Sequence, residues 1–425
     1  MSTRRTDFVT AGVVMALSAL FPGNGWTQEN NPPPTEAPTG FDNLTNGHLV
    51  QGPPFESLTG DNVVARRSFN DNRFIFEETE FDSDGLGPVY NAQSCRECHQ
   101  SVVTGGASQI TELRTGRQGP RGFFASAGGT LIHSRAIDAS LVEQPAYNYN
   151  VSTLRVSTNT LGDGFVEAVA DETLLTIQRA QPPALRGNAI PVPVLEAKGV
   201  NRIGRFGWKS QHASLESFAA DAYLNEMGIT SPLFPEENTA DGKSVKAYDH
   251  VADPEDDGID IIAFADFMRA TKAPARGPIT AAARAGEQVF NAVGCNVCHT
   301  PTMVTAPPST PLNGGKFVVS AALGNKIIHP YSDFLLHDVG TGDGIPVVPI
   351  TEGAPVPEVA VTARQIRTAP LWGLRTRNRL MHDGLSFNAV DAIKRHGGQA
   401  AGVRARAEAL GAQQKSQLLS FLESL

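Results

Sequence analysis

Two five-residue stretches of this chain, residues 95–99 and 295–299, contain all four of its cysteines. Each reads Cys-x-x-Cys-His, the signature at which a c-type haem is attached. The two thiols add to the porphyrin, and the histidine that follows supplies the proximal imidazole to the iron. The sequence therefore predicts two covalently bound haem c groups, held by Cys95, Cys98 and His99 in the first stretch and by Cys295, Cys298 and His299 in the second.

A structural zinc site built from two Cys-x-x-Cys pairs is the alternative. The two pairs of such a site usually lie close together in the sequence, because one ion must be reached by both. Here they are 200 positions apart, and a histidine follows each pair although the chain has only 10 histidines in 425 residues. The motif therefore favours haem over zinc, and thioether formation leaves no thiol for a disulfide.

The N-terminus has the pattern of a secretory signal peptide. Arg4 and Arg5 precede an apolar run over residues 8–21, and small and turn residues follow at 23–25. The run is shorter than the roughly 20 residues that a membrane-spanning helix needs, so we expect cleavage after a signal over residues 1–27, with an uncleaved anchor as the alternative. Export to the periplasm also suits haem attachment, which takes place outside the bacterial cytoplasm. No later stretch is apolar and long enough to indicate an integral membrane protein.

Composition narrows the class of protein further. The 41 glycines and 29 prolines favour a loop-rich fold, which is common where a porphyrin replaces part of the side-chain core. The net charge of −9 argues against nucleic acid as a partner. An acidic surface suits a basic electron donor, but many exported proteins are acidic, so charge alone selects no partner.

Turn residues and hydropathy divide the mature chain into two haem domains. A polar, Pro-rich start predicts a disordered leader over residues 28–60. We expect an N-terminal haem domain over 61–275 and a cytochrome c-like haem domain over 276–425. Gly-rich turns between short alternating runs predict a β-hairpin-containing insertion in the first domain at about 105–200. The expected fold is mainly α, with two cytochrome c-like domains.

Individual elements follow from spacing and from stop signals. Asp171 has the position of an N-cap for a helix that Pro182 ends. The expected helices are 172–180, 214–227, 259–271, 281–293, 389–396 and 404–425, and the expected strands are 123–124, 130–133, 151–156 and 165–167.

Seven stretches together resemble a known family, the dihaem oxidoreductases also called thiol oxidoreductases, within the bacterial dihaem cytochrome c peroxidase superfamily. The resemblance covers residues from about 60 to 425. The seven stretches together are specific for this family, whereas no single one of them is. The matching stretches are 85–99, 204–209, 226–230, 294–301, 331–340, 367–373 and 381–384.

The resemblance implies different roles for the two haems. The N-terminal haem would bind peroxide, and the C-terminal haem would relay electrons with both axial positions filled. Trp208 would carry electrons between the haems, and Glu226 would act as the acid–base group over the first iron. A core tryptophan and a solvated helix-end carboxylate are the alternatives. Phe218 stands where the peroxidases tend to carry glutamine, which weakens the expectation of classical peroxidase activity.

Axial ligands beyond the two motif histidines also come from the resemblance. His396 lies 14 residues after His382, the spacing of the distal ligand in relay haems, which implies a bis-histidine second haem. His382 would orient a propionate or a loop. The rival ligands of the second haem are Met381, His329 and His337, and the residues considered for the sixth position of the first haem are His133 and His212.

Two charged clusters have weaker interpretations. Arg202 and Arg205, with Lys209, could pair with haem propionates or form a solvated basic loop. The acidic runs at 253–257 and 82–84 suggest calcium, although neither has the full ligand spacing of a known calcium loop.

The sequence leaves three functions open. The first is a periplasmic dihaem oxidoreductase that reduces peroxide, or another small oxidant, with electrons from a small cytochrome or cupredoxin. The second is a dihaem electron-transfer cytochrome without a substrate. The third is a haem enzyme that oxidises a protein residue or an organic compound.

Overall fold

The structure is a computed structural model that describes residues 33–40, 69–145, 147–347 and 360–425. The predicted signal peptide and most of the predicted leader lie outside these ranges. Residues 33–40, which were assigned to the leader, instead contribute strand β1 (Thr35–Glu36), which pairs in parallel with β12 (Lys326–Ile328). The described residues belong to one unit, Pro33–Leu425, and the boundary near residue 275 stays a prediction.

Short helices surround the first motif. The motif itself forms one turn, α2 (Cys95–Cys98). α5 continues directly into a π-helical turn, η5 (Tyr223–Met227). The other helices of this part are α1 (Phe69–Glu77), α3 (Asp163–Glu167), α4 (Asp171–Ala180), α5 (Leu215–Ala222) and α6 (Ile259–Ala270).

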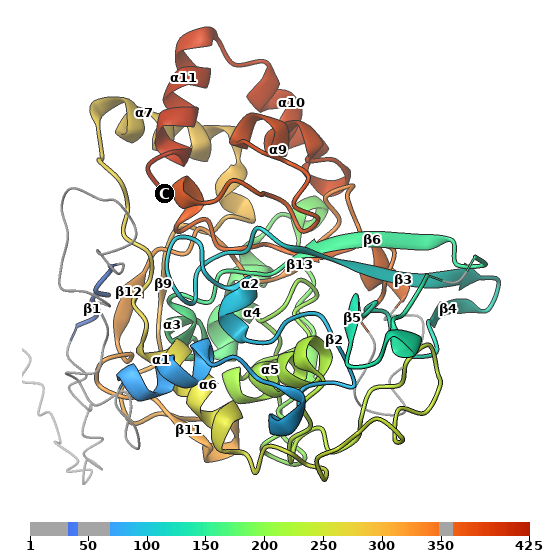
Figure 1. Cartoon of the computed structure of the whole chain (residues 1–425). Coiled ribbons are helices and arrows are strands. Elements are labelled where there is room, and N and C mark those ends of the chain that lie inside the picture. Colours follow the sequence, from blue (N-terminus) through green and yellow to red (C-terminus); the bar gives the residue numbers. More distant parts are fainter. Residues whose placement is uncertain (1–32, 41–68, 146, 348–359) are drawn as a thin grey trace, which may run out of the picture. The chain divides into compact units, whose positions relative to one another are not determined.

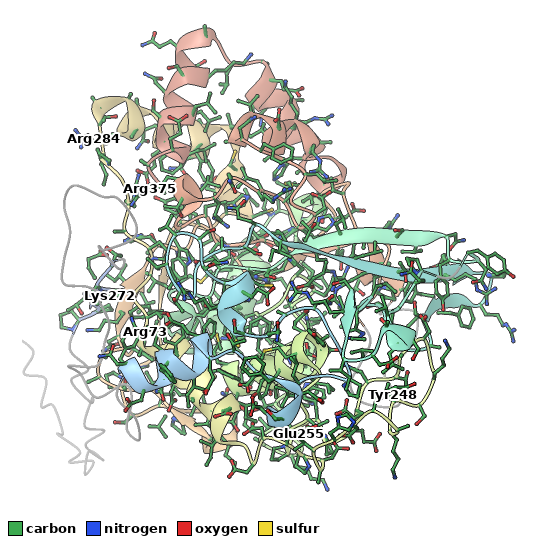
Figure 2. All side chains as sticks on the ribbon, in the orientation of Figure 1. Arg73, Tyr248, Glu255, Lys272, Arg284 and Arg375 are labelled. Atoms are coloured by element: carbon green, nitrogen blue, oxygen red, sulfur yellow. The ribbon has the colours of Figure 1, made fainter. Side chains whose placement is uncertain are left out.

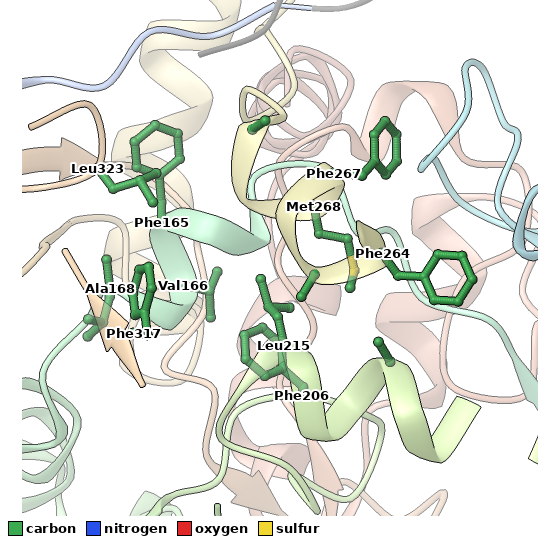
Figure 3. Packing of buried hydrophobic residues seen from close by; sticks show 14 of the residues in the cluster. Phe165, Val166, Ala168, Phe206, Leu215, Phe264, Phe267, Met268, Phe317 and Leu323 are labelled. Atoms are coloured by element: carbon green, nitrogen blue, oxygen red, sulfur yellow. The ribbon is translucent and has the colours of Figure 1, made fainter. Parts of the chain in front are cut away.

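The largest apolar core joins the two halves of the sequence. Phe76 of α1 packs against Phe264 and Phe267 of α6, with ring centroids 6.1 and 4.7 Å apart. Phe317 and Leu323, from beyond the second motif, lie in the same cluster (Figure 3). Because burying one such side chain contributes roughly 1.5–3 kcal/mol, this shared core holds the two halves together.

The predicted insertion contains a three-stranded antiparallel sheet in the order β4-β3-β6 (Figure 1). β3 (Thr111–Gly119) and β4 (Gly122–Ala125) form a hairpin, and β6 (Val151–Val156) pairs along the other edge of β3. The first residues of β3 pair with the last residues of β6. That end of the sheet reaches the cavities described below.

A group of helices surrounds the second motif (Figure 1). Its tightest contact is between α7 and α11, where a Cβ atom on Gly286 would lie 1.9 Å from the carbonyl oxygen of Gln417. Phe290 and Phe421 pack beside this contact with centroids 5.1 Å apart. The helices are α7 (Ala281–Val293), α9 (Ala389–Arg395), α10 (Ala401–Glu408) and α11 (Ala412–Leu422).

Short strands also recur outside the insertion, so the mainly α prediction is only partly supported. They form small sheets that connect loops instead of one continuous layer. Among the described residues, no helix is long and apolar enough to cross a membrane. The remaining strands are β2 (Val89–Tyr90), β5 (Arg135–Ala136), β7 (Pro191–Pro193), β8 (Asn201–Ile203), β9 (Met303–Val304), β10 (Pro311–Leu312), β11 (Phe317–Val318), β13 (Leu336–His337) and β14 (Ile366–Arg367).

Most predicted helices are confirmed, and four local predictions are wrong. Residues 130–133 do not form the predicted strand, because only Leu131 pairs, in an isolated bridge with Arg114. Residues 165–167 belong to helix α3, because Gly164 lets this segment pack directly against the backbone of Arg269 in α6. Ala170 is the N-cap of α4, and the Asp171 carboxylate instead accepts a hydrogen bond from the Ile203 amide. The helix predicted over 404–425 is two helices, α10 and α11, which are separated near Gly411.

Candidate haem sites

The first motif forms a capped helical turn at the edge of a cavity of about 350 Å³. The Ser94 hydroxyl accepts a hydrogen bond from the Glu97 amide, which is an N-cap. Cys95, Cys98 and His99 all line the cavity. Burial lowers the pKa of His99 to about 4, which keeps the imidazole neutral, the form that binds a metal ion.

Ionisable side chains line the same cavity. Glu226 lies on η5, and β3 contributes Glu112 and Arg114. Burial and then the charge of Glu112 raise the pKa of Glu226 well above its usual range, while Arg114 acts in the opposite direction. Asn91 donates to the Glu226 carboxylate at 3.5 Å. Glu226 is therefore placed at the first motif, as the resemblance implies.

The two histidines considered for the first haem lie in different surroundings. The Nδ1 of His133 lies 2.9 Å from Glu143, and its Nε2 lies 3.0 Å from the Asn225 carbonyl oxygen, so both ring nitrogens are already bonded. His212 lines the cavity, with Nε2 3.1 Å from the Asp221 carboxylate. Phe218 also lines the cavity, so an apolar group does stand there.

The second motif follows α7, which ends at Gly294 in the left-handed conformation (φ 95°). This residue turns the chain directly into Cys295, as only glycine does without strain. Cys295, Cys298 and His299 line a second cavity of about 220 Å³. Met381, His382 and His396 line it as well.

His299 and His396 form a pair in this second cavity, with ring centroids 6.4 Å apart. The Nδ1 of His299 donates to the Tyr331 carbonyl at 3.0 Å, and the Nδ1 of His396 donates to the Ala392 carbonyl at 2.6 Å. Since a carbonyl oxygen only accepts, each Nε2 keeps its lone pair. Metal–imidazole bonds are about 2 Å long, so this separation fits one metal ion between the two rings.

The rival ligands are placed less favourably. His329 is half-exposed, and its two ring nitrogens lie 3.0 Å from Thr302 and from Glu36. His337 is buried, with Nε2 2.8 Å from the Asp333 carboxylate, and it lies outside the lining of the second cavity. Met381 does line the cavity and stays a rival to His396.

Trp208 lines both cavities, together with residues 156–158. Its indole nitrogen donates to the Val156 carbonyl at 2.6 Å, and its ring lies edge-on to His382 with centroids 6.2 Å apart. An aromatic side chain therefore stands in the wall that the two sites share.

The predicted propionate partners are engaged elsewhere. Arg202 donates to Asn313 and to the carbonyls of Glu167 and Val169, and Arg205 pairs with Asp171. Neither arginine is among the residues that line these two cavities. Their proposed contact with haem propionates therefore has no geometric support.

Other cations are closer to the cavities. Lys209, the third cation of the predicted propionate cluster, lines the first cavity and donates to Asp343 at 3.1 Å. Arg367, Arg377 and Arg379, which the sequence reading missed, line the second cavity. No local pattern marks these residues, because their chain neighbours do not predict which loop faces a cavity.

The acidic clusters are partly used within the fold. Asp256 accepts hydrogen bonds from the Gly258 and Asp260 amides at the start of α6, and Asp82 lies 3.0 Å from the His250 ring. Asp253 and Glu255 gather with Glu237, which the sequence reading missed, with carboxylate oxygens within 4.8 Å of one another. Glu255 is labelled in Figure 2. Calcium binding stays a prediction.

The two cavities fit a pair of haem groups. Each presents two thiols and a neutral imidazole at one side, the donor set of a c-type attachment. The second cavity also contains buried polar atoms without a hydrogen-bond partner among the described residues, the Nδ1 of His382 and the Nε of Arg377. Such atoms suit an anionic group such as a propionate.

A profile of the family described as "Di-haem oxidoreductase, putative peroxidase" matches residues 134–425. The chain belongs to the dihaem oxidoreductase family. The match includes the second haem motif and begins after the first. Membership implies haem as the cofactor of this dihaem oxidoreductase.

Two solved structures are similar at low identity. Hydrazine synthase from Kuenenia stuttgartiensis is 15% identical, with 97% of this chain and 100% of that chain covered and a TM-score of 0.37. A MauG-like protein associated with microbial copper homeostasis is 14% identical, with 94% and 95% covered and a TM-score of 0.39. Scores this low support no argument about fold or function. No curated protein matches the chain.

Proposed function

We propose that this dihaem oxidoreductase reduces peroxide at the first cavity with electrons that arrive through the second. The observation that carries the proposal is the difference between the cavities. The second presents two imidazoles 6.4 Å apart, which suits an iron with both axial positions filled. The first is larger and is lined by Glu226, which suits a site where a small oxidant binds and protons move.

Haem iron, when bound, supplies the redox chemistry of both sites. His99 and His299 would hold the two irons from one side, and His396 would hold the second iron from the other. Cys95 and Cys98, or Cys295 and Cys298, would fix each porphyrin through thioether bonds. The proposed attachment points therefore include every cysteine of the chain.

Glu226 is the residue that we propose moves the proton. Cleavage of a peroxide O–O bond needs a proton to leave the oxygen near the iron and to reach the far oxygen, which departs as water. A carboxyl group with a raised pKa can accept and return that proton near neutral pH. The contact with Asn91 holds the carboxylate in the cavity.

Trp208 is the proposed route for electrons, since it lines both cavities. A small cytochrome or cupredoxin is the proposed donor. We further propose that the protein works in the periplasm after export, because haem attachment through cysteines takes place outside the bacterial cytoplasm.

Peroxide titration of the holoprotein tests the proposal. With one haem reduced, we expect one high-spin haem whose optical spectrum changes when peroxide is added, and catalytic consumption of peroxide when a donor is present. Two low-spin haems that do not react with peroxide would identify an electron-transfer cytochrome instead. A reaction with peroxide without turnover by donor proteins would favour oxidation of a protein or an organic substrate.

A further inference from the structure

Strand β3 of the insertion brings a second carboxylate and its counter-ion to Glu226. One terminal nitrogen of Arg114, Nη2, lies 3.7 Å from Glu112 Oε2 and also 3.7 Å from Glu226 Oε1. The Glu112 and Glu226 carboxylates therefore meet at the same guanidinium nitrogen. Their side chains are 9% and 22% exposed, and both line the first cavity.

Both carboxylates lie 3.7 Å from the same nitrogen, and both side chains are largely buried. Two like charges that close together in a buried site do not both ionise near neutral pH. The single positive charge of Arg114 balances the one negative charge that remains. The three residues therefore form a unit that holds one proton.

We propose that Glu112 and Glu226 share one proton, that Arg114 holds the two carboxyls together, and that this pair is the proton store of the first cavity. The inference rests on the proposed peroxide chemistry and deepens it. Glu226 is the member nearer to the reacting atoms in the proposed mechanism. Glu112 and Arg114 act through Glu226, so they are positioning residues.

The proton balance gives the pair a defined task. Reduction of hydrogen peroxide to two waters breaks the O–O bond and consumes two electrons, from the one-electron donor protein, and two protons. Proton transfer between the two peroxide oxygens needs an ionised carboxylate as acceptor. The additional protons need a donor close by, which the protonated partner supplies before solvent replaces its proton. A singly protonated pair offers both groups at once.

Other charged groups around the pair have partners of their own. Arg155 from β6 and Lys209 both bind the buried carboxylate of Asp343. His212 lies 3.1 Å from Asp221 on α5. His99 faces the cavity as the proposed iron ligand. The charges of these other ionisable groups are therefore balanced by their own neighbours. A substitution of Glu112 should mainly change the protonation of the Glu112–Glu226 pair.

The test compares E112Q, E226Q and R114Q, with E172Q as a control that neutralises an exposed carboxylate of α4. Two quantities are measured on each holoprotein: the infrared C=O band of a buried protonated carboxyl, and the pH profile of the reaction with hydrogen peroxide. E112D and R114K, which keep the charges, serve as conservative variants.

We expect the infrared band of the pair at neutral pH in the wild type and in E172Q, and its loss in E112Q and E226Q. In E112Q the alkaline limb of the pH profile should move to lower pH by about one unit or more, since the raising effect of a like charge is lost. In R114Q the alkaline limb should move to higher pH, because the cation that lowers the pKa of Glu226 is gone. E112D and R114K should return toward the wild-type profile.

The outcomes separate the inference from the proposed function. If peroxide reacts but E112Q and R114Q leave the limb and the band unchanged, the proton-sharing pair is wrong and the proposed function stands. Shifts of both variants in the same direction would also refute it, since a merely structural role predicts that result. If no peroxide reaction occurs, the proposed function fails, and the infrared band alone still decides whether the pair exists.

Discussion

The two cavities of this protein start from the same five-residue motif, share the wall that contains Trp208, and differ in most of their other lining residues. The first is about 350 Å³ and is lined by ionisable side chains from η5, β3 and α5. The second is about 220 Å³ and contains the pair of His299 and His396. The motif thus determines where two thiols and an imidazole stand together, and distant segments determine which other side chains meet them there.

The largest effect is expected at the axial position of the second haem. His396→Ala removes the imidazole opposite His299, and we expect one low-spin haem to become high-spin, which erases the contrast between the two sites. Resonance Raman and optical spectra of the holoprotein measure this change. His329→Ala, at a half-exposed site, is the matched control and should leave both spectra unaltered. An unchanged spectrum in His396→Ala would leave Met381 as the ligand to test.

The wall between the cavities is the next place to test. Trp208→Phe should slow electron transfer from the second haem to the first by about tenfold or more, which corresponds to about 1.4 kcal/mol in the barrier. The ligation spectra of both haems should stay as they are. Stopped-flow reduction and reoxidation give the rate, and Trp372→Phe, a buried tryptophan outside both cavity linings, is the control. Equal rates in the two variants would exclude Trp208 as the route.

Asp343 belongs to the C-terminal half of the sequence, and its two ion pairs join that half to the lining of the first cavity. Substituting it tests how much these ion pairs stabilise the fold. Its carboxylate binds Arg155 and Lys209, so Asp343→Asn leaves two buried cations without their partner. We expect a loss of about 3–5 kcal/mol in unfolding free energy, measured by chemical denaturation. Neutralising the exposed Glu172, which pairs with Arg179, should change it by less than about 1 kcal/mol. Similar losses in both variants would contradict this account.

The Asp343 carboxylate also makes the stability of the fold depend on pH. Burial alone would raise the pKa of Asp343, but Arg155 and Lys209 hold it below its usual value. A group with a lowered folded-state pKa stabilises the fold above its unfolded pKa, near 4, and loses this contribution as pH falls through the folded value. Acid unfolding should therefore begin at higher pH in Asp343→Asn than in the wild type, and coincident acid transitions would count against it.

The smallest effect is expected in the helix pair beside the second haem. Gly286→Ala places a methyl group against the Gln417 carbonyl and should separate α7 from α11. Overpacking of this kind costs about 1–3 kcal/mol, which a lowered Tm would show. Gly402→Ala on α10, where a Cβ atom meets only the end of the Arg406 side chain at 3.7 Å, is the control. Equal Tm values for both variants would show that the contact can relax.

Much of the local structure could be predicted from the sequence. The α7 helix has the predicted bounds, and the Gly294 turn into the second motif follows from adjacent residues alone. One prediction failed because a distant contact overrides the local pattern. Residues 165–167 have the composition of a strand, yet they form α3 because Gly164 packs against α6.

The sequence by itself determined that this chain carries two haem attachment motifs, because thiols and imidazole must be neighbours in the chain to serve one haem. Tertiary structure alone decided that β3 brings Glu112 to Glu226, that His396 meets His299, and that Trp208 lines both cavities. In each of these cases, the residues that meet are far apart in the sequence. Their proximity depends on the shared apolar core and on how the insertion folds back, and no local spacing encodes either.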